Sequence, residues 1–243
     1  MKIRIYNGKG TSRNSLKHTL HTFSNYAPVK YQIGYISAEE IILGDWFDDT
    51  ALLIIPGGAD LHYCKYLNGK GNIQIQRYLM QGGSFLGICA GAYYSGTSIE
   101  FAKSSSMEVV STRELGVYKG MVVGPALCRY HYNSNKGVRA AKITFDIDGR
   151  VNETVVFYNG GGYCVNAENV PDTKIIATYE DLRAAIIMCN FGKGKAILSG
   201  VHFEYDYSLL KPFKLLNPVI DLLKKHDESR DSLVKYIVNK LIL

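Results

Sequence analysis

Two short apolar runs constrain the fold of this chain more than any other feature. Residues 51–55 read ALLII and residues 84–88 read SFLGI, with Pro-Gly-Gly directly after the first run and Cys89 directly after the second. Strands that are almost wholly apolar are typical of the buried centre of a parallel sheet with helices on both faces. Residues 72–83, which lie between the two runs, have apolar residues at helical spacing and end in two glycines, which predicts a helix.

The N-terminal segments continue this alternation of strand and helix. The predicted elements are a strand at 2–6, a helix at 15–23, a strand at 29–36 and a short helix that begins with a capping box at 37–40. This order predicts an α/β fold with a doubly wound, mostly parallel sheet. On the predicted first helix, we expect His18 and His21 to lie on the solvated side.

The C-terminal half is expected to add antiparallel hairpins and then helices. Residues 138–158 and 183–201 each alternate apolar and polar residues around a turn that contains glycine. We expect both hairpins to be additions to the parallel core. From about residue 207, apolar residues at helical intervals predict a helical tail of one or two helices.

The composition excludes several classes of protein. None of the five cysteines forms a CxxC pair, so we expect reduced thiols and neither a disulfide framework nor a metal site. The formal charge is +6 with lysine and arginine scattered, which predicts no nucleic-acid partner. No apolar run has the length of a membrane helix, and residues 1–8 lack the apolar core of a secretory signal. We therefore expect a soluble cytoplasmic protein, one domain over residues 1–243, and no cofactor.

The sequence around Cys89 has the form of a nucleophile elbow, a tight turn from a strand into a helix. The turn strains the backbone of its central residue, so the neighbours must be small, and here they are Gly87, Ala90 and Gly91. A thiol at a helix N-terminus also gains from the helix dipole, which favours the reactive thiolate. The alternative is a buried structural thiol in an ordinary turn.

Glycines also follow the first apolar strand, at Gly57 and Gly58. Glycine at the carboxyl end of a parallel strand lets backbone N–H groups approach a ligand closely, as an oxyanion hole requires. A tight connecting loop explains the same residues. Because ligands of doubly wound sheets bind at the carboxyl ends of the strands, we expect Gly57, Gly58 and Cys89 to lie close together.

A third strand, predicted to end near residue 201, leads into His202 and Glu204. At strand spacing, residues i and i+2 lie on one face, so the carboxylate could orient the imidazole while the imidazole takes a proton from Cys89. The alternative is an exposed histidine and glutamate in a loop.

Further candidates for the pocket are weaker. Three consecutive glycines begin at Gly160 and cost backbone entropy without a packing return, which predicts a pocket wall at Asn159 and Gly160. The GxGxxG spacing of a dinucleotide site is absent. Tyr93 follows the elbow and is a further pocket candidate. His62 is either a pocket residue or, as is more usual, a surface histidine.

Taken together and in their order, several motifs resemble a known family. The motifs are LLIIPGGAD, GGSFLGICAGAYY, YNGGGYCV and GKGKAILSGVHFE. They resemble the class I glutamine amidotransferase-like family, most closely the domain at the N-terminus of eukaryotic-type biotin–protein ligases, and the resemblance extends to about residue 206. It implies a flavodoxin-like sheet, a catalytic triad and an oxyanion hole made by two backbone N–H groups. The implied residues are Cys89, His202 and Glu204 for the triad, and Gly58 and Ala90 for the oxyanion hole.

The chain departs from glutamine-specific members of that family at three positions. Ala92 and Tyr93 occupy the positions that usually hold His or Met and then a substrate-binding Gln, and Phe203 replaces a common proline. The biotin ligase catalytic domain, with its nucleotide loop, is not part of this chain.

The resemblance and the residues support two main hypotheses. The first is a glutamine amidotransferase-like cysteine hydrolase that acts on a small-molecule or peptide carboxamide, with a synthetase or a biotin–protein ligase as its partner. The second is a non-catalytic binding or regulatory module associated with biotin–protein ligation. A relative of the PfpI-type cysteine proteins, which share the elbow, ranks lower because they usually lack a His-x-Glu near the C-terminus.

Overall fold

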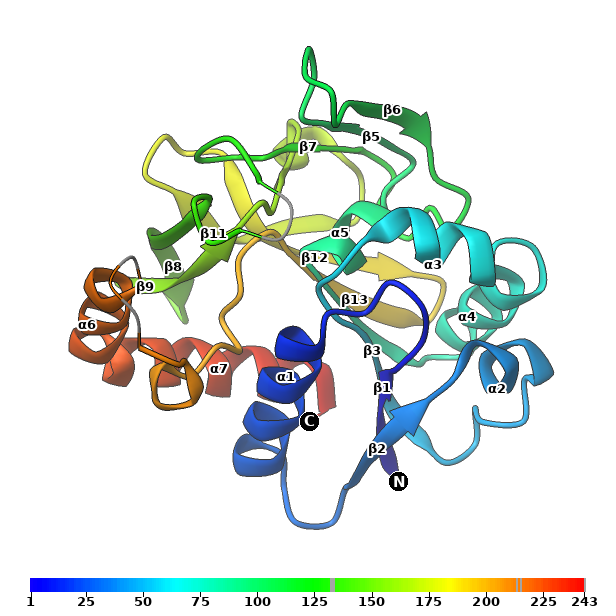
Figure 1. The fold of residues 1–243 in the computed structure, drawn as a ribbon. Coiled ribbons are helices and arrows are strands. Elements are labelled where there is room, and N and C mark those ends of the chain that lie inside the picture. Colours follow the sequence, from blue (N-terminus) through cyan, green and yellow to red (C-terminus); the bar gives the residue numbers. More distant parts are fainter. Residues whose placement is uncertain (132–133, 213, 215, 243) are drawn as a thin grey trace.

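The computed structural model describes residues 1–131, 134–212, 214 and 216–242, and the strands among them form one mixed sheet (Figure 1). The strands are β1 (Lys2–Tyr6), β2 (Gln32–Ile36), β3 (Thr50–Ile55), β4 (Ser84–Ile88), β5 (Ser98–Phe101), β6 (Val109–Thr112), β7 (Met121–Gly124), β8 (Val138–Ile147), β9 (Arg150–Asn159), β10 (Tyr163–Cys164), β11 (Thr173–Tyr179), β12 (Ala184–Phe191) and β13 (Gly194–Ser199). The α-helices are α1 (Arg13–Tyr26), α2 (Ala38–Leu43), α3 (Asp60–Leu67), α4 (Lys70–Met80), α5 (Ala90–Ser95), α6 (Asn217–Lys225) and α7 (Asp227–Ile242). Across the described ranges, no helix has the length and apolar character needed to cross a membrane.

The parallel half of the sheet forms the centre of the protein. Strands β2, β1, β3, β4 and β13 lie side by side in this order, and each neighbouring pair is parallel. Helices α1 and α7 cover one face, and α2, α3, α4 and α5 cover the other (Figure 1). Burial on both faces explains why β3 and β4 are so apolar. The predicted doubly wound parallel core is confirmed.

The other half of the sheet is mainly antiparallel. Beyond β12 the sheet continues through β10, β7, β5 and β6, and β11, β8 and β9 branch from β12. The predicted hairpin over 138–158 is confirmed as β8 and β9. The hairpin over 183–201 also forms, but the expectation that it lies outside the parallel core is wrong, because β13 pairs in parallel with β4. This central place fits the sequence of β13, where Ala196, Ile197 and Leu198 are at most 1% exposed.

The helix boundaries follow local sequence signals where such signals exist. Helix α2 begins with the predicted capping box: the Ser37 hydroxyl accepts a hydrogen bond from the Glu40 N–H, and the Glu40 carboxylate accepts one from the Ser37 N–H. The helix predicted at 72–83 is α4 and begins at Lys70. Helix α3 was not predicted, and it starts without a side-chain cap.

The C-terminal helices hold the segment that follows β13 against the sheet. The described part of the tail forms a 3₁₀ turn at Tyr207–Leu209, and the first α-helix begins at Asn217, later than predicted. On α7, the buried side chain of Arg230 forms ion pairs with Asp227 and Asp231, both at 2.9 Å. Arg230 also donates a hydrogen bond to the backbone carbonyl of Phe203 at 3.3 Å. One cation therefore ties α7 to the segment that carries His202.

We expect the substitution Arg230→Leu to lower the free energy of unfolding by about 2 kcal/mol, because it leaves two partly buried carboxylates without their cation and one carbonyl without its donor. Urea unfolding followed by circular dichroism measures this loss. Lys235→Gln, at an exposed position of the same helix, is the matched control and should change stability by less than about 0.5 kcal/mol. A similar small effect of both substitutions would contradict the proposed role of Arg230.

Candidate active site

Cys89 lies at a strained turn between β4 and α5. Its backbone has φ 51° and ψ −102°, a conformation that a residue with a side chain rarely adopts. The Cys89 N–H donates to the Ser199 carbonyl at 2.7 Å, which holds the turn to the end of β13. A Cβ atom at Gly91 would lie 2.1 Å from the Ile55 carbonyl oxygen, so only glycine allows α5 to pack this closely on β3. The structure therefore has the predicted elbow geometry.

His202 and Glu204 are buried next to Cys89, and they form a close pair. The His202 Nδ1 lies 2.8 Å from the Glu204 Oε1, and the two residues are 4% and 0% exposed. They do not lie on a strand, because β13 ends at Ser199 and a turn follows. The assumed strand spacing is thus wrong, although the pairing that it predicted is present. With Nδ1 bonded to the carboxylate, the other ring nitrogen, Nε2, is available to Cys89.

The electrostatics of this pair favour a charged imidazolium. Burial by itself would lower the pKa of His202, but the negative charges of Glu204 and Cys89 outweigh burial and raise the pKa to about 10. Since this value lies above the ordinary pKa of 6.5, the charged pair stabilises the fold fully below about pH 6.5, and this stabilisation is lost as the pH rises towards 10. The imidazolium is therefore present at neutral pH, where it can stabilise a Cys89 thiolate.

The glycines after β3 lie beside the triad. The Gly57 N–H donates to the Ser15 hydroxyl at 2.9 Å, and a Cβ at Gly57 would lie 2.6 Å from the His202 Cε1. Gly58 pairs with Thr11 in an antiparallel bridge whose hydrogen bonds run through the neighbouring residues. The Gly58 N–H consequently points away from Thr11, and no acceptor for it occurs within the described residues.

A second unpaired N–H group comes from the elbow. Ala90 is the first residue of α5, and the N–H groups of the first helical turn have no acceptor inside the helix. Gly58 and Ala90 thus offer two backbone donors on either side of Cys89, as an oxyanion hole requires.

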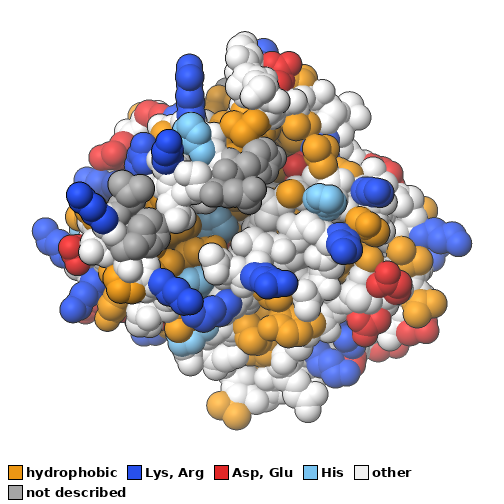
Figure 2. Space-filling model, in the orientation of Figure 1, with side chains coloured by type: hydrophobic (Ala, Val, Ile, Leu, Met, Phe, Trp, Pro, Cys, Tyr) orange, Lys and Arg blue, Asp and Glu red, His pale blue; other side chains and the backbone are white. Residues whose placement is uncertain are grey.

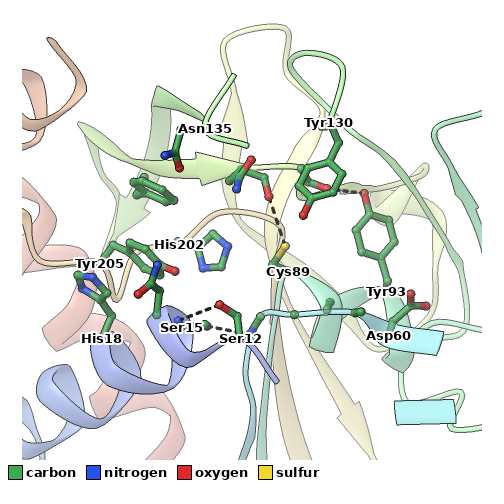
Figure 3. A pocket seen from close by; sticks show the side chains of 18 of the residues that line it. Ser12, Ser15, His18, Asp60, Cys89, Tyr93, Tyr130, Asn135, His202 and Tyr205 are labelled. Atoms are coloured by element: carbon green, nitrogen blue, oxygen red, sulfur yellow. Dashed lines mark hydrogen bonds between the residues drawn. The ribbon is translucent and has the colours of Figure 1, made fainter. Parts of the chain in front are cut away.

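These groups open into a cavity of about 550 Å³, shown with its lining side chains in Figure 3. Gly57, Tyr93, Asn159 and Gly160 all belong to its wall, where the sequence placed them. The Tyr93 hydroxyl donates to the Gly160 carbonyl at 3.1 Å, and the Cys89 Sγ lies 3.9 Å from the Asn159 carbonyl oxygen. Tyr93 is 4% exposed and its hydroxyl is engaged, so it shapes the wall of the cavity.

Sequence reasoning placed one histidine wrongly. His18 was expected on the solvated side of α1, but it is 2% exposed and lines the cavity. Its ring stacks on Tyr205 with centroids 3.9 Å apart, and its Nδ1 accepts a hydrogen bond from the Asp206 N–H at 3.1 Å. His21 is half-buried and lies 3.3 Å from the Asp206 carboxylate. His62 is exposed and lies on the cavity wall.

Two further site features come from residues that are far apart in the sequence. Ser15 on α1 donates to the Glu204 carboxylate at 3.4 Å and accepts from the Gly57 N–H. Asp60, at the start of α3, accepts from the Nε of Arg113 at 2.9 Å. Neither Ser15 nor Asp60 stands in a motif that could have singled it out. Within the described ranges, no cluster of potential metal ligands is present.

A solved structure supports the fold. The protein is similar to a GMP synthase subunit from Thermoplasma acidophilum, with a TM-score of 0.51 and 13% identity, over 95% of this chain and 98% of that chain. At this identity the similarity concerns the fold alone. It confirms the expected flavodoxin-like, class I glutamine amidotransferase-like α/β fold.

Sequence comparisons identify the family. The chain is 31% identical to a biotin–protein ligase of Schizosaccharomyces pombe over 99% of its own length but only 38% of the ligase. It is 33% identical to an uncharacterized protein of Chlamydia muridarum, over 99% of this chain and 96% of that protein. The family model described as biotin-protein ligase, N terminal, matches residues 1–243. The chain therefore belongs to the biotin–protein ligase N-terminal family.

Proposed function

We propose that this protein is a cysteine-dependent amide hydrolase that acts on a carboxamide substrate. The observation that carries the proposal is the buried His202–Glu204 pair at 2.8 Å beside a cysteine held in a strained elbow. A merely structural thiol needs neither the strained backbone nor a buried ion pair at its side. Together with the free N–H groups of Gly58 and Ala90, the arrangement contains each part that acyl transfer requires.

In the first half of the reaction, the Cys89 thiolate attacks the carbonyl carbon of the carboxamide. A carbon–sulfur bond forms, and the electron pair of the carbonyl moves onto its oxygen, where the N–H groups of Gly58 and Ala90 stabilise the negative charge. The intermediate then collapses, the carbon–nitrogen bond breaks, and His202 donates its proton to the departing nitrogen. The products of this half are ammonia and a thioester on Cys89.

In the second half, water hydrolyses the thioester. Neutral His202 takes a proton from the attacking water, and Glu204 stabilises the imidazolium that forms. The carbon–sulfur bond breaks, the carboxylic acid leaves, and the thiolate–imidazolium pair is restored. No external oxidant or cofactor is needed to balance this cycle.

A non-catalytic binding or regulatory module is the second candidate. It is favoured by Tyr93, which stands where glutamine-specific relatives use a substrate-binding residue and which here forms part of the wall through its bond to Gly160. In this role the cavity would bind a ligand without turnover. The name of the Schizosaccharomyces pombe relative points to biotin–protein ligation as the process served, with a ligase or another synthetase as partner for either candidate.

The first prediction concerns turnover. Purified protein should release ammonia from at least one member of a panel of primary carboxamides that includes glutamine, and Cys89→Ala should abolish this release. We expect Glu204→Gln to lower the rate by about 100-fold, because an imidazole without its carboxylate partner is a poor proton carrier. Ammonia is measured by a coupled glutamate dehydrogenase assay. Release that does not depend on Cys89 would overturn the hydrolase, and ligand binding without release would support the binding module.

The second prediction concerns the reactivity of Cys89 against pH. Because the imidazolium of His202 persists until the pH approaches 10, iodoacetamide should alkylate Cys89 in the wild-type protein readily between about pH 6 and 8. In His202→Gln we expect slow alkylation at neutral pH and a steep rise above about pH 8, as for an ordinary thiol. Mass spectrometry of the Cys89 peptide excludes labelling of the half-buried Cys64 and Cys128. Identical profiles for both proteins would contradict an activated thiolate.

The third prediction uses the close contact between Gly57 and His202. A methyl group at Gly57 would displace the imidazole, so Gly57→Ala should lower kcat by about 100-fold, the usual effect of a shift of about 1 Å in a catalytic group. The control is Gly34→Ala on β2, where an added Cβ meets no atom within 4 Å. Equal rates for the two variants would show that the position of His202 does not limit the reaction.

A further inference from the structure

We propose that the cavity contains a subsite for a carboxylate, formed by His18, Lys17 and Lys211, and that the substrate is consequently the amide of an acid that keeps a second, free carboxylate. The identity of the substrate rests on the proposed function, whereas the subsite itself can be tested by binding alone. All three residues line the same cavity as Cys89. None of them was singled out by the sequence as a ligand-binding residue.

His18 supplies a buried hydrogen-bond donor with a fixed direction. Its Nδ1 accepts the Asp206 N–H at 3.1 Å, so the proton of the neutral ring is on Nε2. Burial, with a smaller contribution from the positive charge of Lys17, lowers the pKa of His18 to about 3 and keeps the ring neutral. No acceptor for the Nε2–H occurs among the described residues, although the residue is only 2% exposed. A buried donor without a protein acceptor on a cavity wall is suited to a ligand oxygen.

Lys17 and Lys211 bring positive charge to the same side of the cavity. The Lys17 Nζ donates to the Leu209 carbonyl at 3.3 Å, which holds this ammonium group over the segment that leads to Lys211. No carboxylate pairs with either lysine within the described part of the chain. Figure 2 shows blue side chains around the central hollow, while red side chains gather towards the margin of this face.

The acidic groups near the cavity are already neutralised by partners of their own. Asp60 is the acidic residue among the described lining residues, and it pairs with the buried Arg113 at 2.5 Å. Glu204 pairs with His202 below the cavity wall. The cavity mouth therefore has an excess of positive charge, which attracts an anionic ligand and disfavours a cationic one.

An aromatic stack connects this subsite to the triad. The ring of Tyr205 lies between that of His18, at 3.9 Å, and that of Phe157, at 4.3 Å, and it lies 4.7 Å from the His202 ring. The carboxylate subsite is thus separated from the catalytic imidazole by one aromatic ring. A substrate that reaches both needs an apolar spacer of several bonds between its carboxylate and its carboxamide, and the stack would pack against that spacer.

The test compares monoamides of dicarboxylic acids with the corresponding diamides. Succinic, glutaric, adipic and suberic acids give pairs in which only the charge at the far end differs. Binding to the Cys89→Ala protein, which cannot turn the amides over, is measured by isothermal titration calorimetry at low salt. We expect at least one monoamide to bind about tenfold more tightly than its diamide, because charge-assisted hydrogen bonds replace neutral ones.

Three variants locate the effect. Replacing both lysines, by Lys17→Gln and Lys211→Gln together, should bring the monoamide close to its diamide in affinity, and His18→Phe should weaken the monoamide while the stack on Tyr205 remains. The control is Lys235→Gln on α7, which removes an equal charge away from the cavity and should leave both affinities unchanged. Thermal melting confirms that each variant is folded.

Equal affinities for the two amides, an unchanged preference in the lysine double variant, or no binding of any monoamide would overturn the subsite. A clear preference for the monoamide without Cys89-dependent ammonia release would instead overturn the hydrolase and leave the subsite standing. The two proposals can therefore fail separately.

Discussion

The strained backbone at Cys89 is the constraint on which the rest of the site depends. A residue with φ 51° and ψ −102° costs about 1–3 kcal/mol, so the surrounding structure must hold it in place. Here the support comes from β3 and β13 on either side of β4, with the Cys89 N–H bonded to the Ser199 carbonyl and Gly91 packed on the carbonyl of Ile55. The strain points the thiol out of the sheet into the cavity, and a parallel sheet buried on both faces is rigid enough to maintain it.

Local patterns were sufficient to predict the parallel core and the elbow. The strands around residues 51–55 and 84–88 are encoded by their own apolar runs, and the turn at Cys89 by its small neighbours, so no distant contact had to be known. His202 and Glu204 were also identified correctly as neighbours. Their pairing comes from a turn after β13, however, so the spacing of two residues led to the right pair for a partly wrong reason.

The features that could not be predicted depend on contacts between distant segments. His18 has polar neighbours on α1 and therefore looks solvated, yet the segment around Tyr205 and Asp206 covers it in the folded protein. Likewise, the partner of Asp60 is Arg113, which arrives from beyond β6. The central position of β13 was missed because a hairpin sequence shows which strand pairs with its neighbour across the turn, but not which strand pairs on the other side.

One hydroxyl group couples the two halves of the site. Ser15 donates to the Glu204 carboxylate and accepts from the Gly57 N–H, so the acid of the triad and the loop before Gly58 share a partner on α1. The second oxygen of Glu204, Oε2, has no hydrogen-bond partner among the described residues, and a buried carboxylate in this state depends on His202 and Ser15 for its stabilisation. Any movement of α1 must therefore change the orientation of Glu204 and the position of the oxyanion loop together. Since α1 also carries Lys17 and His18, a ligand that binds these residues would act on the catalytic geometry through the same helix.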